Sequence, residues 1–151
     1  MSRTHLGVVA AVVAAATFAP PALAKPAVDV TYGGRTSAKW PVMLQLSRDG
    51  RQVAYALAAW STQCSGGSFS DQEEFEHVPV SAAGKFSSSY DTGDYQNGSA
   101  TLRFAASLTG KINKRRSSIT GTVRVFSSVK DPANGVDETC DTGTVKYVAV
   151  D

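Results

Sequence analysis

The residues able to do acid–base chemistry gather in one stretch, DQEEFEH at 71–77. It holds four carboxyl groups and His77, the single histidine left once the expected export signal is removed. A Ser-His-acid hydrolase would have to use His77 with Asp71 or Glu74. Strand alternation places His77 on the same face as Phe75, and no G-x-S-x-G elbow occurs in the chain. The sequence therefore favours a structural histidine and a protein without enzyme activity.

Carboxylate oxygens are also ligands for hard cations such as calcium. A calcium loop alternates its ligands around a glycine turn, and the acidic stretch lacks that order. The sequence predicts a solvated acidic segment, with weak calcium binding as the less favoured alternative. No metal and no cofactor are expected.

Cys64 and Cys140 are the two cysteines of the chain. Metal pairs and redox dithiols need close spacing such as C-x-x-C, whereas these two residues lie far apart. In an oxidising compartment paired thiols persist as disulfides. The spacing predicts a structural Cys64–Cys140 bridge, which contributes about 4–5 kcal/mol to stability by the chain-entropy model.

A basic cluster and three aromatic residues are the candidate ligand-binding groups. The cluster is KINKRR at 111–116, with Lys114, Arg115 and Arg116 at its end. It could grip an anionic polymer such as a teichoic acid or a sulfated glycan. The alternative, which the sequence favours, is a hairpin tip whose charges keep neighbouring strand edges soluble.

Aromatic side chains could present a platform for sugar rings. Trp40 and Tyr55 occupy strand positions that favour burial in the core. Phe69, Tyr90 and Tyr95 lie in expected loops or at strand ends. These three are the aromatic residues expected to be exposed and able to contact a ligand.

Residues 1–24 have the order of a secretory signal: Arg3, an apolar run from Leu6 to Phe18, and an Ala22-Leu23-Ala24 end. The apolar run is shorter than the ~20 residues that span a bilayer as a helix. Cleavage after Ala24 leaves 127 residues with a net charge of +1. The sequence predicts secretion, no membrane attachment after cleavage and no nucleic-acid partner.

Apolar and polar residues alternate through the mature chain, as is typical of half-buried strands. The Asp49-Gly50 pair between two such runs indicates a hairpin. The pattern predicts an antiparallel β-sandwich of about eight strands, with a small closed β-barrel as the alternative. The expected strands cover 28–32, 39–47, 52–60, 75–80, 85–90, 99–108, 118–129 and 143–150.

One domain over 25–151 is expected, without an internal repeat. The longest predicted loops are 64–74 and 130–138, and a shorter one covers 91–98. Loops on a rigid sandwich are where recognition residues are commonly placed. These three segments are therefore the expected binding loops.

Four short patterns carry a resemblance: Tyr32-Gly33-Gly34-Arg35-Thr36, the reversal at 46–51, Cys64-Ser65-Gly66-Gly67, and Cys140-Asp141-Thr142-Gly143. Over most of residues 30–150 the chain resembles small exported bacterial proteins, actinobacterial-like, with one disulfide in a β-domain. The chain has Tyr147 in its last strand, where a tryptophan is common in that group. The resemblance implies an exported one-disulfide β-domain and does not imply an activity.

These patterns together predict a secreted, non-catalytic binding or envelope-associated module, monomeric, that recognises an extracellular glycan, a cell-wall polymer or a protein. Two alternatives come from other classes. One is a small secreted hydrolase that uses His77. The other is a secreted protease inhibitor that presents a loop pinned near the disulfide.

Overall fold

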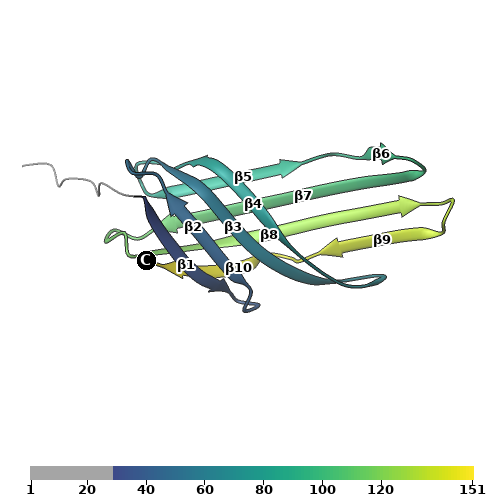
Figure 1. Ribbon diagram of the computed structural model, residues 1–151, viewed down its shortest axis with the longest axis horizontal. Coiled ribbons are helices and arrows are strands. Elements are labelled where there is room, and N and C mark those ends of the chain that lie inside the picture. The colour runs from purple at the N-terminus through teal and green to yellow at the C-terminus, as the bar shows by residue number, and fades with distance from the viewer. Residues whose placement is uncertain (1–28) are drawn as a thin grey trace, which may run out of the picture.

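The computed structural model describes residues 29–151, and the expected export signal lies outside that range. Every regular element among the described residues is a β-strand (Figure 1). The strands are β1 (Val30–Thr36), β2 (Pro41–Leu46), β3 (Gln52–Cys64), β4 (Gly67–Pro79), β5 (Lys85–Asp91), β6 (Tyr95–Asn97), β7 (Ala100–Ile112), β8 (Ser118–Asp131), β9 (Val136–Asp141) and β10 (Val145–Val150).

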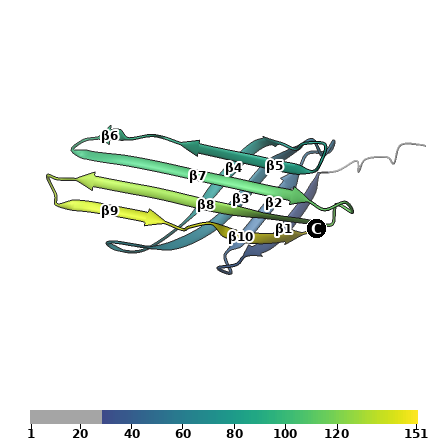
Figure 2. The same cartoon turned by 180° about the vertical axis from the view of Figure 1, so that it is seen from behind.

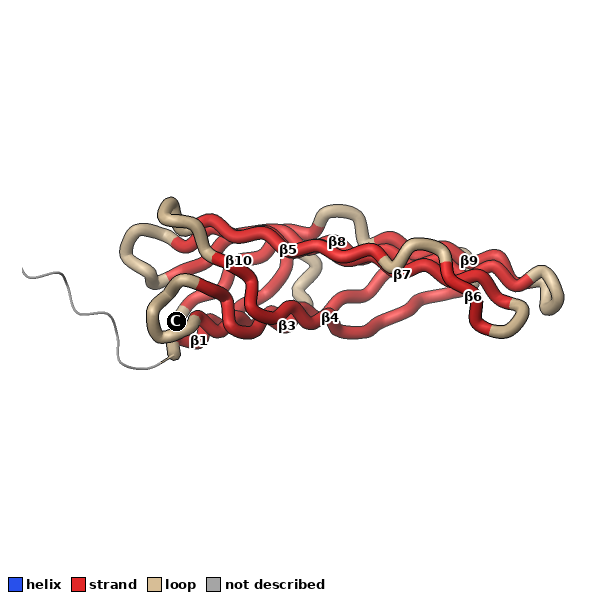
Figure 3. The backbone as a smooth tube through the Cα atoms, turned by 90° about the horizontal axis from the view of Figure 1, so that it is seen from above, coloured by secondary structure: helices blue, strands red, loops and turns tan. Residues whose placement is uncertain are grey.

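The strands form one antiparallel sheet in the order β4-β3-β2-β1-β10-β8-β7-β5, with β6 also paired to β7 and β9 to β8. The sheet curls until β4 approaches β5, where Val80 and Phe86 form an isolated bridge. Seen from above, β3 and β4 lie in one layer and β7 and β8 in the other (Figure 3). The predicted all-β antiparallel class is confirmed, and this nearly closed sheet fits both a sandwich and a barrel.

The hairpin of β2 and β3 follows directly from its residues. Alternate positions of β2 from Val42 to Leu46 are buried, whereas Met43 is exposed. In the reversal, the Asp49 carboxylate accepts the backbone N–H two residues further on at 2.9 Å. Gly50 has φ 62°, a conformation that costs glycine little because it has no Cβ. The predicted hairpin is confirmed.

Two tyrosines, Tyr32 and Tyr147, are the largest fully buried side chains. Each hydroxyl donates to a backbone carbonyl: Tyr32 to Arg116 at 2.6 Å and Tyr147 to Thr109 at 2.9 Å. Gly121 makes room for the second ring, since a Cβ there would lie 2.6 Å from the phenol oxygen. Both polar ends are therefore satisfied inside the core. The core around them includes Leu44, Val53, Leu108, Ile119 and Val125.

Two aromatic residues expected in the core lie outside it. Trp40 is 38% exposed because β2 begins one residue later. Tyr55 is only half-buried, and its hydroxyl hydrogen-bonds Glu74 instead of packing inside. In β3 both Val53 and Ala56 are buried, so the alternation is interrupted between them. Residues after this irregularity point to the opposite face of the sheet from the one that a regular period of two predicts.

The interruption continues in β4 at His77, which has φ 53° and is exposed. Phe75 and Val78 are both buried, so two residues lie between consecutive core positions where an unbroken strand has one. The prediction that His77 shares a face with Phe75 is wrong. An extra residue in left-handed conformation turns the histidine away from the core.

Two of the predicted long loops are hairpins. β3 and β4 join through a two-residue turn, Ser65-Gly66, so most of 64–74 is strand. β8 and β9 join through residues 132–135, and β6 occupies part of 91–98. Seen from behind, β6, β7, β8 and β9 run on beyond the place where β3 and β4 cross them (Figure 2). Their polar sequences look like loops because these extensions bury little apolar surface.

Candidate functional site

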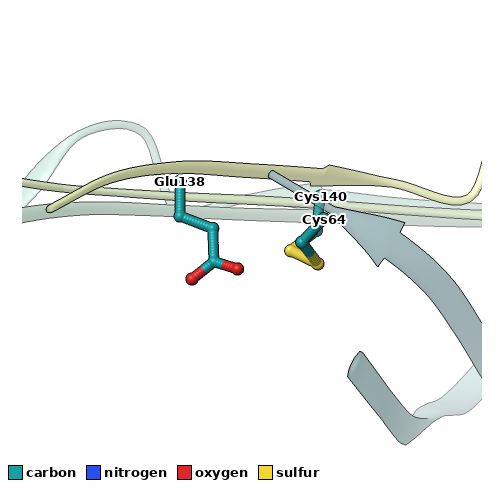
Figure 4. A group of neighbouring side chains, drawn as sticks. All are labelled: Cys64, Glu138 and Cys140. Carbon is teal, nitrogen blue, oxygen red and sulfur yellow. A yellow bond between two sulfur atoms is a disulfide. The ribbon is translucent and has the colours of Figure 1, made fainter. Parts of the chain in front are cut away.

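The predicted disulfide is present: Cys64 at the end of β3 is bonded to Cys140 of β9, and both residues are buried. The carboxylate of Glu138 lies beside this bridge (Figure 4). It accepts a hydrogen bond from the backbone N–H of Gly66 at 3.2 Å. The hydroxyl of Thr62 donates to the Asp141 carbonyl at 2.9 Å. The tip of the β3–β4 hairpin is thus fixed to β9 by one covalent bond and several hydrogen bonds.

Cys64, Cys140 and Glu138 also form a group of potential metal ligands, with donor atoms within 4.8 Å of one another. Thiolate, not disulfide sulfur, is the ligand that zinc prefers. The two sulfurs are bonded to each other and the carboxylate holds a hairpin turn. This cluster therefore has a structural role, connecting β9 to the β3–β4 hairpin.

The predicted basic cluster lies in the turn between β7 and β8, where Lys114, Arg115 and Arg116 are all exposed. Lys114 and Arg116 line a cavity of about 1040 Å³. Arg51, from the β2–β3 turn, and Lys111, from the end of β7, line the same cavity. Arg115 is not among its lining residues. Two of the three predicted cations, Lys114 and Arg116, thus line this cavity, and the fold adds Arg51 from a distant segment.

Arg116 fixes the floor of this cavity, which we call the basic cavity. Its φ is 58°, and its carbonyl accepts the hydrogen bond from the buried Tyr32 hydroxyl. Its guanidinium packs on Gly50, where a Cβ would lie 2.5 Å from a guanidinium nitrogen, and donates to the Gly50 carbonyl at 3.5 Å. Glycine at position 50 thus permits the close contact that joins the two turns.

The charges around the basic cavity are mostly of one sign. Its lining holds four cationic side chains and one carboxylate, that of Asp49. Asp49 is engaged with its own turn, accepting hydrogen bonds from the Ser47 hydroxyl at 2.7 Å and from a backbone N–H. Clustered charges of one sign around a cavity raise the local concentration of counter-ions. Arg51 is itself paired with Asp49 at 3.7 Å, and the lining keeps an excess of positive charge.

The three aromatic residues expected to be exposed are exposed: Phe69 50%, Tyr90 40% and Tyr95 46%. None of them lines the basic cavity. Phe69 packs against Trp60 with ring centroids 5.6 Å apart. Tyr95 lies opposite Leu102 in the pairing of β6 with β7. The structure therefore spreads these aromatics over several strands, away from the predicted cations.

Tyr90 has a structural role between the layers. Its ring lies 6.4 Å from Phe75 of β4 and 5.9 Å from Phe104 of β7, centroid to centroid. Its hydroxyl donates a hydrogen bond to the carboxylate of Glu73. Burial raises the pKa of Glu73, and burial together with this hydrogen bond raises the pKa of Tyr90. The pair joins β4 to β5.

The residues named for a hydrolase are not brought together. His77 and Asp71 lie six residues apart on the same strand, which corresponds to about 20 Å between their Cα atoms. Glu74 hydrogen-bonds Tyr55. A catalytic base must lie within hydrogen-bond reach of its partners, and strand β4 gives His77 no such arrangement with Asp71.

Sequence reasoning missed a repeated motif on the outer face of the sheet. The tripeptide Asp-Thr-Gly occurs at 91–93 and again at 141–143. In each copy the aspartate accepts the N–H of the glycine, at 2.9 Å and 2.8 Å, and the glycine has φ 63° or 62°. This three-residue motif is too short to be an internal repeat of a structural unit. Comparing the two tripeptides would have revealed it.

The two threonines perform the same task in their copies. The Thr92 hydroxyl accepts the N–H of Phe104 at 2.9 Å, and the Thr142 hydroxyl accepts the N–H of Val125 at 2.9 Å. In each copy the segment that carries the motif gains one residue relative to its neighbouring strand, between β5 and β6 or between β9 and β10. The hydroxyl stands in for the backbone partner that this bulge displaces.

Each aspartate also holds an arginine in a two-pronged ion pair. Arg103 bonds Asp91, and Arg124 bonds Asp141, with nitrogen–oxygen distances of 3.1 and 2.6 Å in both pairs. Hydrogen bonds from Arg103 and from the Gly93 N–H lower the pKa of Asp91 to about 2. The bond from Arg124 likewise lowers the pKa of Asp141. Both carboxylates are therefore ionised at neutral pH.

The motif copies are related by a local two-fold axis through the pair Ala105 and Phe126. Pairing places Asp91 opposite Ala105, Ala105 opposite Phe126, and Phe126 opposite Asp141. The two aspartates thus stand three strand spacings apart, about 14 Å between Cα atoms. Acid proteases need two aspartates about 3 Å apart that share a proton. The repeated tripeptide is therefore no such catalytic pair.

A second cavity, of about 600 Å³, lies over this row and contains both arginines in its lining. Its other lining residues include Asp91, Ala105 and Phe126. The guanidinium of Arg103 lies 5.9 Å from the centre of the Phe126 ring. We call this hollow the twin-motif cavity. It combines fixed charges of both signs with two aromatic residues, Phe126 and the predicted ligand-binding residue Tyr90.

Comparison of the chain with protein-family models, with curated proteins and with solved structures finds no match. Among residues 29–151 no helix has the length and apolar character required to cross a bilayer. The disulfide is consistent with an extracellular protein. The proposed function therefore rests on the geometry of residues 29–151.

Proposed function

We propose that this chain is a secreted, non-catalytic binding module that holds an anionic polymer of the cell envelope at the basic cavity. The observation that carries the proposal is the convergence of Arg51, Lys111, Lys114 and Arg116, from the β2–β3 and β7–β8 hairpins, on one cavity of about 1040 Å³. A teichoic acid or a sulfated glycan presents the repeated anionic groups that such a site attracts.

Two features distinguish this site from a turn that is charged only for solubility. The Tyr32 hydroxyl holds the backbone of Arg116, and the contact with Gly50 positions its guanidinium before a ligand arrives. Arg51 comes from a different turn, and a gatekeeper role for the β7–β8 tip does not require it. The export signal expected at 1–24, the disulfide and the resemblance to exported bacterial one-disulfide domains support an extracellular location.

The two alternative functions have less structural support. The inhibitor hypothesis rests on a loop pinned near the disulfide, and that segment is a two-residue hairpin turn. The hydrolase hypothesis rests on His77, which is exposed at a bulge about 20 Å along the strand from Asp71.

Binding to heparin and to poly(glycerol phosphate) teichoic acid tests the proposal. The double variant Lys111→Gln/Lys114→Gln should weaken binding about 10- to 30-fold, since each cation facing a polyanion contributes about 1 kcal/mol. Arg116 is left unchanged because its contacts hold the turn. Lys130→Gln/Lys146→Gln is the matched control, since it removes the same charge from exposed positions outside the lining. Equal weakening by both double variants, or no binding to either polymer, would overturn the proposal.

A further inference from the structure

The twin-motif cavity has the volume of a small-molecule binding site. Its floor carries the small side chains of Ala105 and Ser107, while Arg103, Arg124 and Phe126 surround them. Ligand pockets in proteins commonly enclose about 300–1,000 Å³, and this hollow is about 600 Å³. The small residues in the middle of β7 are what leave the space.

The polar groups around the hollow are fixed in advance. The Asp91 carboxylate receives two hydrogen bonds from Arg103 and one from the Gly93 N–H. Arg124 is held in the same way by Asp141. Because these bonds use Nε and Nη2, each guanidinium keeps its Nη1 donors for another partner. A ligand would meet oriented donors and acceptors without first ordering them.

The charges of the twin-motif cavity cancel, in contrast to those of the basic cavity. Its lining holds two arginines and one aspartate, Asp91, and Arg124 is paired with Asp141 just outside the lining, so an anion gains little net attraction. Neighbouring sugar hydroxyls both donate and accept hydrogen bonds, which suits carboxylate acceptors beside guanidinium donors. Phe126 supplies an apolar surface for the C–H groups of a sugar ring.

We propose that the twin-motif cavity is a second binding site, for an uncharged oligosaccharide, independent of the anion site at the basic cavity. The bidentate pairs orient the sugar hydroxyls and Phe126 packs against the ring. The two sites together would let one exported domain contact a neutral glycan chain and an anionic polymer.

Amide chemical shifts of the exported, disulfide-bonded protein, followed during titration with chitotetraose, cellotetraose and maltotetraose, test this site. At least one sugar should give saturable shifts at Ser89, Arg103, Ala105, Arg124 or Phe126. Its affinity should stay constant between about 50 and 500 mM salt, because the ligand has no charge to screen. Absence of saturable shifts with all three sugars would overturn the proposal.

Two variants locate the site. Phe126→Ser should weaken sugar binding about 3- to 10-fold through loss of the aromatic contact. Ala105→Leu should also weaken it, by filling the hollow without altering either ion pair. Val148→Ser is the matched control, since it removes an exposed apolar side chain elsewhere. Dispersed amide spectra check the folding of each variant. Sugar shifts that persist unchanged in both cavity variants would contradict the assignment.

The two proposals fail independently. Lys111→Gln/Lys114→Gln should abolish most polyanion binding and leave the sugar titration unchanged. Phe126→Ser should do the reverse. A parallel loss of both activities in either variant would contradict the separation of the sites.

Discussion

The two Asp-Thr-Gly copies share their internal hydrogen bonds but differ in what they support. The copy at 91–93 leads into β6, which has three exposed residues at the sheet edge. The copy at 141–143 leads into β10, which lies between β1 and β8 and carries the buried Tyr147. The same local bonds thus produce the same bulge, whereas burial decides how much of the fold depends on it.

The residues that precede the two aspartates also differ in how they attach to the β3–β4 hairpin. Cys140 precedes Asp141 and is bonded covalently to β3. Tyr90 precedes Asp91 and reaches β4 through the Glu73 carboxylate and the Phe75 ring. The β3–β4 hairpin is thus fastened to one copy by a covalent bond and to the other by a hydrogen bond and ring packing.

The largest expected effect is the loss of the covalent fastening. Cys64→Ser/Cys140→Ser should lower the free energy of unfolding by about 2–5 kcal/mol, as removal of a native disulfide from a small domain typically does. Urea denaturation measures the change, with the reduced wild-type protein as the control. A loss below about 1 kcal/mol would mean that the hydrogen bonds of the hairpin tip hold β9 without the disulfide.

A smaller difference should separate the two threonines. Thr142→Val removes a part-buried partner of the Val125 N–H and should cost about 1–3 kcal/mol. Thr92→Val exposes the corresponding N–H of Phe104 to water and should cost less than about 1 kcal/mol. Thermal unfolding of both variants measures the two costs. Equal losses would show that the contexts of the two copies are equivalent.

Acid should weaken both copies. The pKa of Asp91 is lowered to about 2 and that of Asp141 is also lowered, so the unfolded chain binds protons more readily than the folded one. Stability from these groups is complete above about pH 4 and is lost as the pH falls towards 2. Asp91→Asn/Asp141→Asn should therefore flatten this part of the pH–stability profile. An unchanged profile would contradict the assignment.

The smallest effect is expected at Glu73, where the sign reverses. Burial raises its folded pKa, so the charged form costs stability as the pH rises above the ordinary carboxyl range. Glu73→Gln keeps an acceptor for Tyr90 and should raise the melting temperature slightly at pH 7. The advantage should disappear near pH 4. A lower melting temperature of the variant at pH 7 would show that the charged hydrogen bond outweighs burial.

The features predicted correctly from the sequence depend on the alternation of apolar and polar residues and on the number and spacing of the cysteines. All eight expected strands and the Cys64–Cys140 bridge are present. Prediction from the sequence failed where one inserted residue changes the face of a strand, as at His77, and where strands pair through polar residues, as in β9. Lys114 and Arg116 were found from sequence, but Arg51 joins them only through the fold.

One titration tests the central claim most directly. Amide shifts of the exported, disulfide-bonded protein are followed as teichoic acid is added at low and at high salt. Shifts should concentrate at 49–51 and 111–116 and weaken steeply with salt, because cations at the basic cavity hold the polymer. Shifts centred elsewhere, or the same affinity at both salt concentrations, would contradict an anion site at this cavity.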